Sequence, residues 1–164
     1  MKIGIISDTH GKFDAAVEGI FRGVDLIIHA GDIGTLDIVE RLESIAPVLA
    51  VEGNNDSFAR YPVERIEHIE GRSVLIRHIF GEIHQLRKAD LEGLLRMASD
   101  IVIFGHSHKP YKAKVGPTLL FNPGSAGARR FSLPRTVGLM TLGASRISTR
   151  IIDLEAKSQL RMHA

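Results

Sequence analysis

The chain has 164 residues, no cysteine and a formal net charge of +2, with 44% hydrophobic and 24% charged residues. This length suits one compact domain, so we expect a single domain over residues 1–164 with a frayed tail after about residue 154. The missing cysteine excludes disulfides and thiolate metal sites, and the scattered basic residues argue against a stable complex with nucleic acid. No apolar run approaches the roughly 18 residues needed to span a bilayer, so we expect a cytoplasmic protein without a membrane partner.

The first third of the chain alternates strand and helix patterns. The short β-branched runs Ile3–Ser7, Asp25–Ala30 and Val48–Val51 predict buried strands. Between them, Phe13–Arg22 and Leu36–Ile45 carry apolar residues at helical spacing. This alternation is typical of a parallel sheet covered by helices.

The pattern then changes to hairpins. The remaining expected elements are, in chain order, a hairpin of Glu64–Ile69 and Ser73–Arg77, a helix over Ala89–Ala98, a buried strand over Asp100–Phe104, a hairpin of Tyr111–Val115 and Thr118–Phe121, and a hairpin of Thr136–Leu142 and Arg146–Asp153. Two α/β architectures combine these parallel and antiparallel elements. One has two mixed sheets packed face to face with helices outside, and the other has a single mixed sheet with helices on both faces.

Five polar clusters each follow an apolar run, and together they contain seven side chains able to bind a metal ion. These residues are Asp8, His10, Asp32, Asn54, His78, His106 and His108. They offer oxygen and imidazole ligands without sulfur, a set that suits Mn, Fe, Co, Ni or Zn. Residues that follow strands of an open α/β sheet meet beyond the carboxyl ends of those strands. Each interval between clusters is long enough for one strand and its return, so we expect one shared metal site.

Most clusters have a simpler explanation when each is taken alone. Asp8 fits an Asx turn, and both Gly31-Asp32 and the Gly-Asn-Asn-Asp segment 53–56 fit ordinary turns. The Gly-His-Ser-His segment 105–108 is more informative, because two histidines in such a position rarely serve packing. The clusters therefore indicate a metal site mainly through their joint occurrence at strand ends.

The other histidines have different interpretations. We prefer His78 to His84 as the fifth ligand because His78 ends a clear strand. His29 lies inside a strand, which favours a hydrogen-bonded core histidine over a ligand.

The clusters read Asp-x-His at 8–10, Gly-Asp at 31–32, Gly-Asn-Asn-Asp at 53–56, a later histidine at 78 and Gly-His-x-His at 105–108. This order resembles the calcineurin-like metallophosphoesterase superfamily. The small size and the Asn-Pro-Gly-Ser segment 122–125 look most like its YfcE-type small phosphodiesterases. The resemblance implies a four-layer αββα sandwich with two central mixed β-sheets. The scaffold subunit of eukaryotic retromer is a relative in the same branch.

The resemblance also implies two metal positions. One would be held by Asp8, His10, Asp32 and His108, and the other by Asp32, Asn54, His78 and His106, with Asp32 bridging the ions. The expected cofactors are therefore two divalent metal ions per chain, with Mn favoured over Ni, Fe, Co or Zn.

Two positions depart from the superfamily pattern. Asn55 stands where most members have a histidine that contacts the phosphate or protonates the leaving group, and Ile79 stands where a glycine often follows the fifth ligand. Asn55 and Asp56 are the candidate catalytic residues. Asn55 can donate a hydrogen bond to a phosphate oxygen but cannot give up a proton, and Asp56 could orient Asn55 or a nearby ligand.

These features predict a hydrolase in which a hydroxide bridging two divalent ions attacks a small phosphodiester. The alternative is a protein-binding scaffold of the same fold with a vestigial metal site. The presence of all seven ligand types favours the enzyme, since a degraded site should lack one or more. We expect a small phosphodiester as the substrate and allow for a homo-oligomer.

Overall fold

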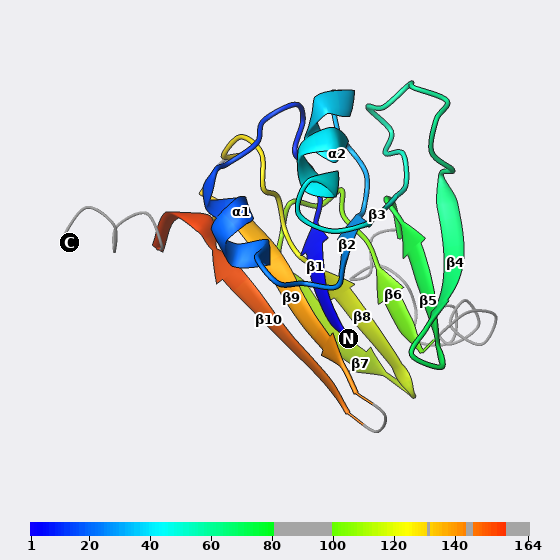
Figure 1. Cartoon of the computed structure of the whole chain (residues 1–164). Helices are drawn as coiled ribbons and strands as arrows, with labels where there is room; N and C mark the ends of the chain where they lie inside the picture. Colours follow the sequence, from blue (N-terminus) through cyan, green and yellow to red (C-terminus); the bar gives the residue numbers. More distant parts are fainter. Residues whose placement is uncertain (81–99, 131, 144–145, 157–164) are drawn as a thin grey trace.

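The computed structural model describes residues 1–80, 100–130, 132–143 and 146–156. These residues form two five-stranded sheets (Figure 1). The first sheet has the order β10-β9-β1-β2-β3, with bounds Lys2–Ile6 for β1, Leu26–His29 for β2, Val48–Ala50 for β3, Thr136–Leu142 for β9 and Ile147–Asp153 for β10. The second sheet has the order β4-β5-β6-β8-β7, with bounds Glu64–Ile69 for β4, Arg72–Arg77 for β5, Ile101–Ile103 for β6, Tyr111–Val115 for β7 and Thr118–Asn122 for β8.

Both sheets are mixed. In the first, β1, β2 and β3 are parallel, while β9 runs antiparallel to β1 and forms a hairpin with β10. In the second, β5, β6 and β8 are parallel, with β4 and β7 antiparallel at the two edges. The parallel strands of each sheet therefore end on the same edge of that sheet, where function is expected in open α/β sheets.

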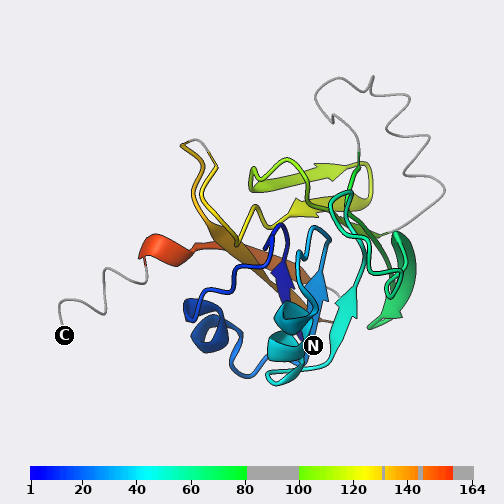
Figure 2. The same cartoon turned by 90° about the horizontal axis from the view of Figure 1, so that it is seen from above.

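The core lies in layers. Alternate residues of β1, such as Ile3 and Ile5, pack between the two sheets against Ile76, Ile103 and other residues of the second sheet. Ile6, which faces the opposite side, packs against the helices α1 (Ala16–Phe21) and α2 (Leu36–Glu43). Figure 2 shows these two helices on the outer side of β1 and β2, with the second sheet on the other side.

The two face-to-face sheets confirm the sandwich predicted from the sequence, and the single-sheet alternative is wrong. The expected helix over Ala89–Ala98, which would form the fourth layer, lies outside the described residues. Neither α1 nor α2 is long and apolar enough to cross a membrane.

Helix α1 begins three residues later than the predicted start at Phe13. The Asp14 carboxylate accepts a hydrogen bond from Ala16 N (2.8 Å), which holds the preceding segment in a local turn. The helix ends before Gly23, whose φ of 76° is in the left-handed region. The apolar spacing thus located the helix, whereas a side-chain hydrogen bond set its first residue.

Candidate metal centre

The candidate ligands lie beyond the carboxyl ends of the strands. Asp8 and His10 follow β1, Asp32 follows β2, Asn54 follows β3, His78 follows β5, and His106 and His108 follow β6. Backbone hydrogen bonds join the loops after β1 and β2, from Asp8 N to the Gly31 carbonyl (3.0 Å) and from His10 N to the Asp32 carbonyl (2.9 Å). The ligand loops are therefore held as one unit.

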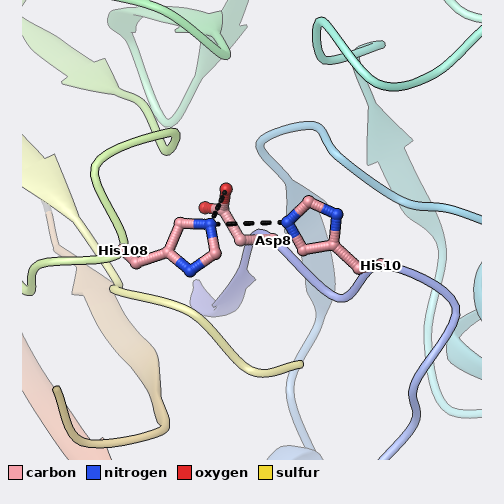
Figure 3. A group of neighbouring side chains, drawn as sticks. All are labelled: Asp8, His10 and His108. Carbon is pink, nitrogen blue, oxygen red and sulfur yellow. Dashed lines mark hydrogen bonds and ion pairs between the residues drawn. The ribbon is translucent and has the colours of Figure 1, made fainter. Parts of the chain in front are cut away.

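Asp8, His10 and His108 form a first group able to hold a metal ion (Figure 3). One ligand atom from each residue lies within 4.8 Å of the others. His108 Nε2 lies 3.3 Å from Asp8 Oδ1, and the Nε2 atoms of His10 and His108 are 3.4 Å apart. The His10 side chain is 33% exposed while Asp8 is buried, so the group opens to solvent on one side.

Asp8, Asp32 and His78 form a second group, and all three are buried. His78 Nε2 lies 3.3 Å from Asp32 Oδ2 and 3.9 Å from Asp8 Oδ1. Asp8 belongs to both groups. Asp32 also reaches both, because its Oδ2 lies 3.7 Å from Nε2 of His10. The two groups are adjacent and share their carboxylates.

The hydrogen-bond pattern of these side chains fits a bound cation. Among the residues that the structure describes, Asp8 Oδ1, His78 Nε2 and His108 Nδ1 are buried without a hydrogen-bond partner. Buried polar atoms are normally satisfied, and an unpaired buried carboxylate oxygen is costly. A divalent ion coordinated by Asp8 Oδ1 and His78 Nε2 would remove that cost for these two atoms. His108 faces the group with Nε2, so its buried Nδ1 does not bear on this argument.

Hydrogen bonds to the backbone orient the buried ligands. Nδ1–H of His78 donates to the Ala30 carbonyl (2.8 Å), which leaves the Nε2 lone pair directed at the carboxylates. Asp8 Oδ2 accepts from the Ser7 hydroxyl (2.7 Å) and from His106 N (3.2 Å). Its second oxygen, Oδ1, remains available as a ligand.

The carboxylates and the buried imidazole perturb each other electrostatically. Burial alone would raise the pKa of the Asp32 carboxyl, but the nearby His78 imidazole and the N–H groups of Asn55 hold it well below its usual range. Burial alone would lower the pKa of His78, but Asp32 and Asp8 together raise it. The shift at Asp32 favours the ionised carboxylate, the form that binds metal. The shift at His78 favours the protonated ring, so a metal ion must displace that proton to bind Nε2.

Most of the ligands have an unusual backbone conformation. Positive φ values between 46° and 68° occur at Asp8, His10, Asp32, His106 and His108. Left-handed backbone costs on the order of 1 kcal/mol at a residue with a side chain, and such residues cluster at functional sites. The fold thus holds five of the seven predicted ligands in conformations that they would rarely adopt in an unconstrained chain.

A calcineurin-like phosphoesterase superfamily domain model matches residues 1–145. The chain belongs to this superfamily. It is 35% identical over 163 residues to a probable metallophosphoesterase of Methanothermobacter thermautotrophicus, covering 93% of this chain and 92% of the relative. It is 32% identical over 155 residues to the phosphodiesterase MJ0936 of Methanocaldococcus jannaschii, covering 85% and 92% of the two chains.

The predicted branch of the superfamily is confirmed as well. The phosphodiesterase YfcE of Escherichia coli is 26% identical over 168 residues, covering 85% of this chain and 87% of the relative. A crystal structure of Vps29 from Entamoeba histolytica in complex with Zn²⁺ has the same fold, with a TM-score of 0.75 at 20% identity over 94% of this chain and 99% of that one. The phosphoesterase fold predicted from the motifs is therefore shown.

The remaining predicted site residues lie at the rim of the phosphoesterase centre. The His106 ring lies edge-on to His78, with ring centroids 5.3 Å apart. Asn55 Nδ2 donates to Asp32 Oδ2 (2.6 Å) and Asn55 N donates to Asp32 Oδ1 (3.0 Å). Asn54 is exposed. The structure thus assembles five predicted ligands directly and places His106 beside them.

Asp56 connects two loops of the phosphoesterase centre. Its carboxylate accepts hydrogen bonds from Ile33 N (3.0 Å), Gly34 N (2.9 Å) and Gly53 N (2.9 Å). It therefore joins the loop of Asp32 to the loop of Asn54. No hydrogen bond from Asp56 to the Asn55 side chain is formed among the described residues, so its contacts orient the backbone rather than that amide.

His29 and Thr9 form a hydrogen-bonded pair behind the phosphoesterase ligands. Gly31 N donates to His29 Nδ1 (3.2 Å), so the proton of the neutral ring is on Nε2, which lies 2.9 Å from the Thr9 hydroxyl. Burial lowers the pKa of His29 to about 4 and keeps the ring neutral. This confirms His29 as a hydrogen-bonded core histidine. The role of Thr9 carried no sequence signal, because it depends on a partner 20 residues away.

Proposed function

We propose that the chain is a phosphodiesterase that depends on two divalent metal ions. The observation that supports this proposal is the pair of adjacent ligand groups with shared carboxylates and unpartnered ligand atoms. When bound, two such ions would polarise the phosphoryl oxygens and lower the pKa of water enough to supply hydroxide at neutral pH. We expect Mn to be the most suitable ion, with Ni, Fe, Co or Zn as alternatives.

The proposed ligand assignment combines the two groups with the order of the superfamily motifs. Asp8, His10, Asp32 and His108 would hold one ion, and Asp32, Asn54, His78 and His106 would hold the other. The Asp32 contacts to one histidine of each group support its bridging position, although Asp8 also touches both. Asn54 is exposed, as are the ligand candidates His10 and His106.

Asn55 determines which substrates the site accepts. Its amide donates to Asp32 and lies at the rim, where it can also donate to a phosphate oxygen, but it has no proton to give to a leaving group. General acid catalysis contributes about 10²–10⁴-fold to such reactions. The enzyme therefore favours small phosphodiesters with good leaving groups, and Asp56 serves by positioning the loops of Asp32 and Asn54.

The similarity of fold to Vps29 favours one alternative, a protein-binding scaffold with a vestigial metal site. A scaffold has no need for two metal ions or for the strained ligand conformations, so metal content and hydrolysis separate the two functions. We expect the enzyme to be cytoplasmic and its substrate to be a small phosphodiester. The proposal is compatible with a homo-oligomer.

The test is hydrolysis of bis-p-nitrophenyl phosphate after metal removal and addition of Mn²⁺. The wild-type protein should turn over the substrate and bind two ions per chain, as counted by elemental analysis. Asp32→Ala should lose both hydrolysis and at least one ion. Asp37→Ala, which removes an exposed carboxylate from α2, is the matched control and should behave as wild type. Equal rates for wild type and Asp32→Ala would rule out the proposed enzyme.

A further inference from the structure

A cleft lies on the open side of the sandwich, between the edge strands β7 and β10. It has a volume of about 490 Å³ and is lined by residues of β5, β7, β8 and β10. Three of the lining residues are cationic, namely Arg72, Lys112 and Lys114, and none of the described lining residues is acidic. A volume of this size is within the range of small-molecule sites.

The register of the strands directs the two lysines toward the space between the sheets. Lys112 is paired with Phe121 and Lys114 with Leu119, and directly paired residues on antiparallel strands lie on the same face. Phe121 is fully buried in the core between the sheets. Lysine thus occupies two positions on a face that carries apolar residues on the central strands β5, β6 and β8, such as Ile76, Ile103 and Phe121.

The opposite wall comes from the first sheet by the same reasoning. Thr149 is paired with Met140 and Ile147 with Leu142, and both partners belong to the core between the sheets. Ile147, Leu119 and Pro117 supply apolar surface to the cleft. The walls therefore combine apolar surface with cationic side chains, a combination that suits an anion with an apolar body.

The charge of the cleft is unbalanced. Lys112 and Lys114 form no ion pair with any residue in the described part of the chain, although the chain carries only +2 formal net charge overall. Like charges that face one cavity repel each other, and an anion between them would relieve this repulsion. Two lysines separated by one residue on a strand can contact two oxygens of the same phosphoryl group or of neighbouring groups.

The cleft is separate from the metal centre. Arg72 begins β5, whereas the metal-ligand candidate His78 directly follows the end of the same strand. At about 3.3 Å per residue, the two positions are roughly 20 Å apart. No described residue that lines the cleft is a metal-ligand candidate, so an anion bound there does not occupy the metal ligands.

We propose that this cleft is a second binding site, which takes a phosphorylated small molecule with its phosphate between Lys112 and Lys114. A nucleic-acid strand fits less well, because the part of the chain that the structure describes places no aromatic side chain in the cleft to stack on bases. This proposal does not depend on the phosphodiesterase activity.

The test uses metal-free protein in EDTA, titrated with pyrophosphate or with AMP and followed by backbone amide NMR shifts. The expected result is saturable binding with shifts at Ala113, Leu119, Ile147 and Thr149. Response to pyrophosphate alone identifies phosphate recognition, and tighter binding of AMP identifies a contribution from the apolar walls. The double variant Lys112→Gln/Lys114→Gln should bind at least about tenfold more weakly.

Two controls make the result specific to the cleft. Lys112→Arg/Lys114→Arg keeps both charges and should retain binding, which separates loss of charge from loss of folding. Lys109→Gln removes an exposed lysine beside the metal-ligand candidate His108 and should bind as wild type. Inward charges on an edge strand also prevent unwanted strand pairing, a role that needs no ligand. Absence of saturable binding, or equal binding by the double glutamine variant, would overturn the proposal.

Discussion

The buried histidine behind the ligand loops should make the stability of this protein sensitive to acid. His29 is fully buried, and burial lowers its pKa from the ordinary 6.5 to about 4. The native state therefore resists protonation of this ring, whereas the unfolded chain accepts the proton near its ordinary pKa. Stability from this group is fully present above pH 6.5 and is lost as the pH falls toward 4.

The magnitude follows from the difference between the two pKa values. Each pKa unit corresponds to about 1.4 kcal/mol, so the complete loss is about 3 kcal/mol at and below pH 4. Between pH 7 and pH 5 the loss is about 2 kcal/mol. The pH dependence of stability has the opposite sign for His78, because its pKa is raised. The stability that His78 contributes is present in acid and is lost as the pH rises through its raised pKa.

The assay is urea unfolding of metal-free protein at pH 7 and pH 5, for the wild type and for His29→Gln. Glutamine has no titratable proton and can still donate a hydrogen bond to the Thr9 hydroxyl. The wild type should lose about 2 kcal/mol more than the variant over this interval. His68→Gln, which removes an exposed histidine from β4, should keep the wild-type pH dependence. An equal loss in wild type and His29→Gln would refute the reasoning.

Two further substitutions test the metal centre. A methyl group added at Gly105 would overlap Ser7 Oγ and lie 2.8 Å from Asp8 Oδ2. Gly105→Ala should therefore lower the affinity for Mn²⁺, measured by calorimetry, by about tenfold or more. Unchanged affinity would show that the Asp8 carboxylate tolerates displacement. Asn55→His should raise kcat for alkyl phosphodiesters by about tenfold or more, because histidine can protonate the leaving group, while leaving p-nitrophenyl esters nearly unaffected. A uniform change on both substrates would remove the leaving-group role assigned to this position.

Much of the fold could be predicted because burial imposes simple periodic patterns. The β-branched run after Lys2 and the alternating residues of Glu64–Ile69 gave strands close to those observed. Several predicted strands extend one residue beyond the observed strand, as at Ser7, because strand pairing stops where the chain turns into the ligand loops. The initiation of α1 at Ala16 depends on one Asp14 hydrogen bond, which apolar spacing cannot reveal.

The candidate site could be predicted only as a set of residue types. Sequence spacing suggested that the ligands meet, and the structure brings Asp8, His10, Asp32, His78 and His108 together. The exposed position of Asn54 could not be predicted, because the motif specifies its order in the chain but not its rotamer. Glycines 31, 53 and 105 each directly precede a candidate ligand, where a glycine is expected to permit a sharp turn. In the structure Gly31 has positive φ, whereas Gly53 and Gly105 do not and instead leave room for a neighbouring aspartate.

The left-handed conformations of the ligand residues have a consequence for how metals are exchanged. Backbone geometry, supported by hydrogen bonds between loops, already presents Asp8, His10 and Asp32 before any ion arrives. An ion can then leave and another can enter without refolding of the loops. Because divalent first-row ions differ in affinity for one set of oxygen and imidazole ligands, the ion bound in the living cell would depend on this affinity order together with the supply of each ion.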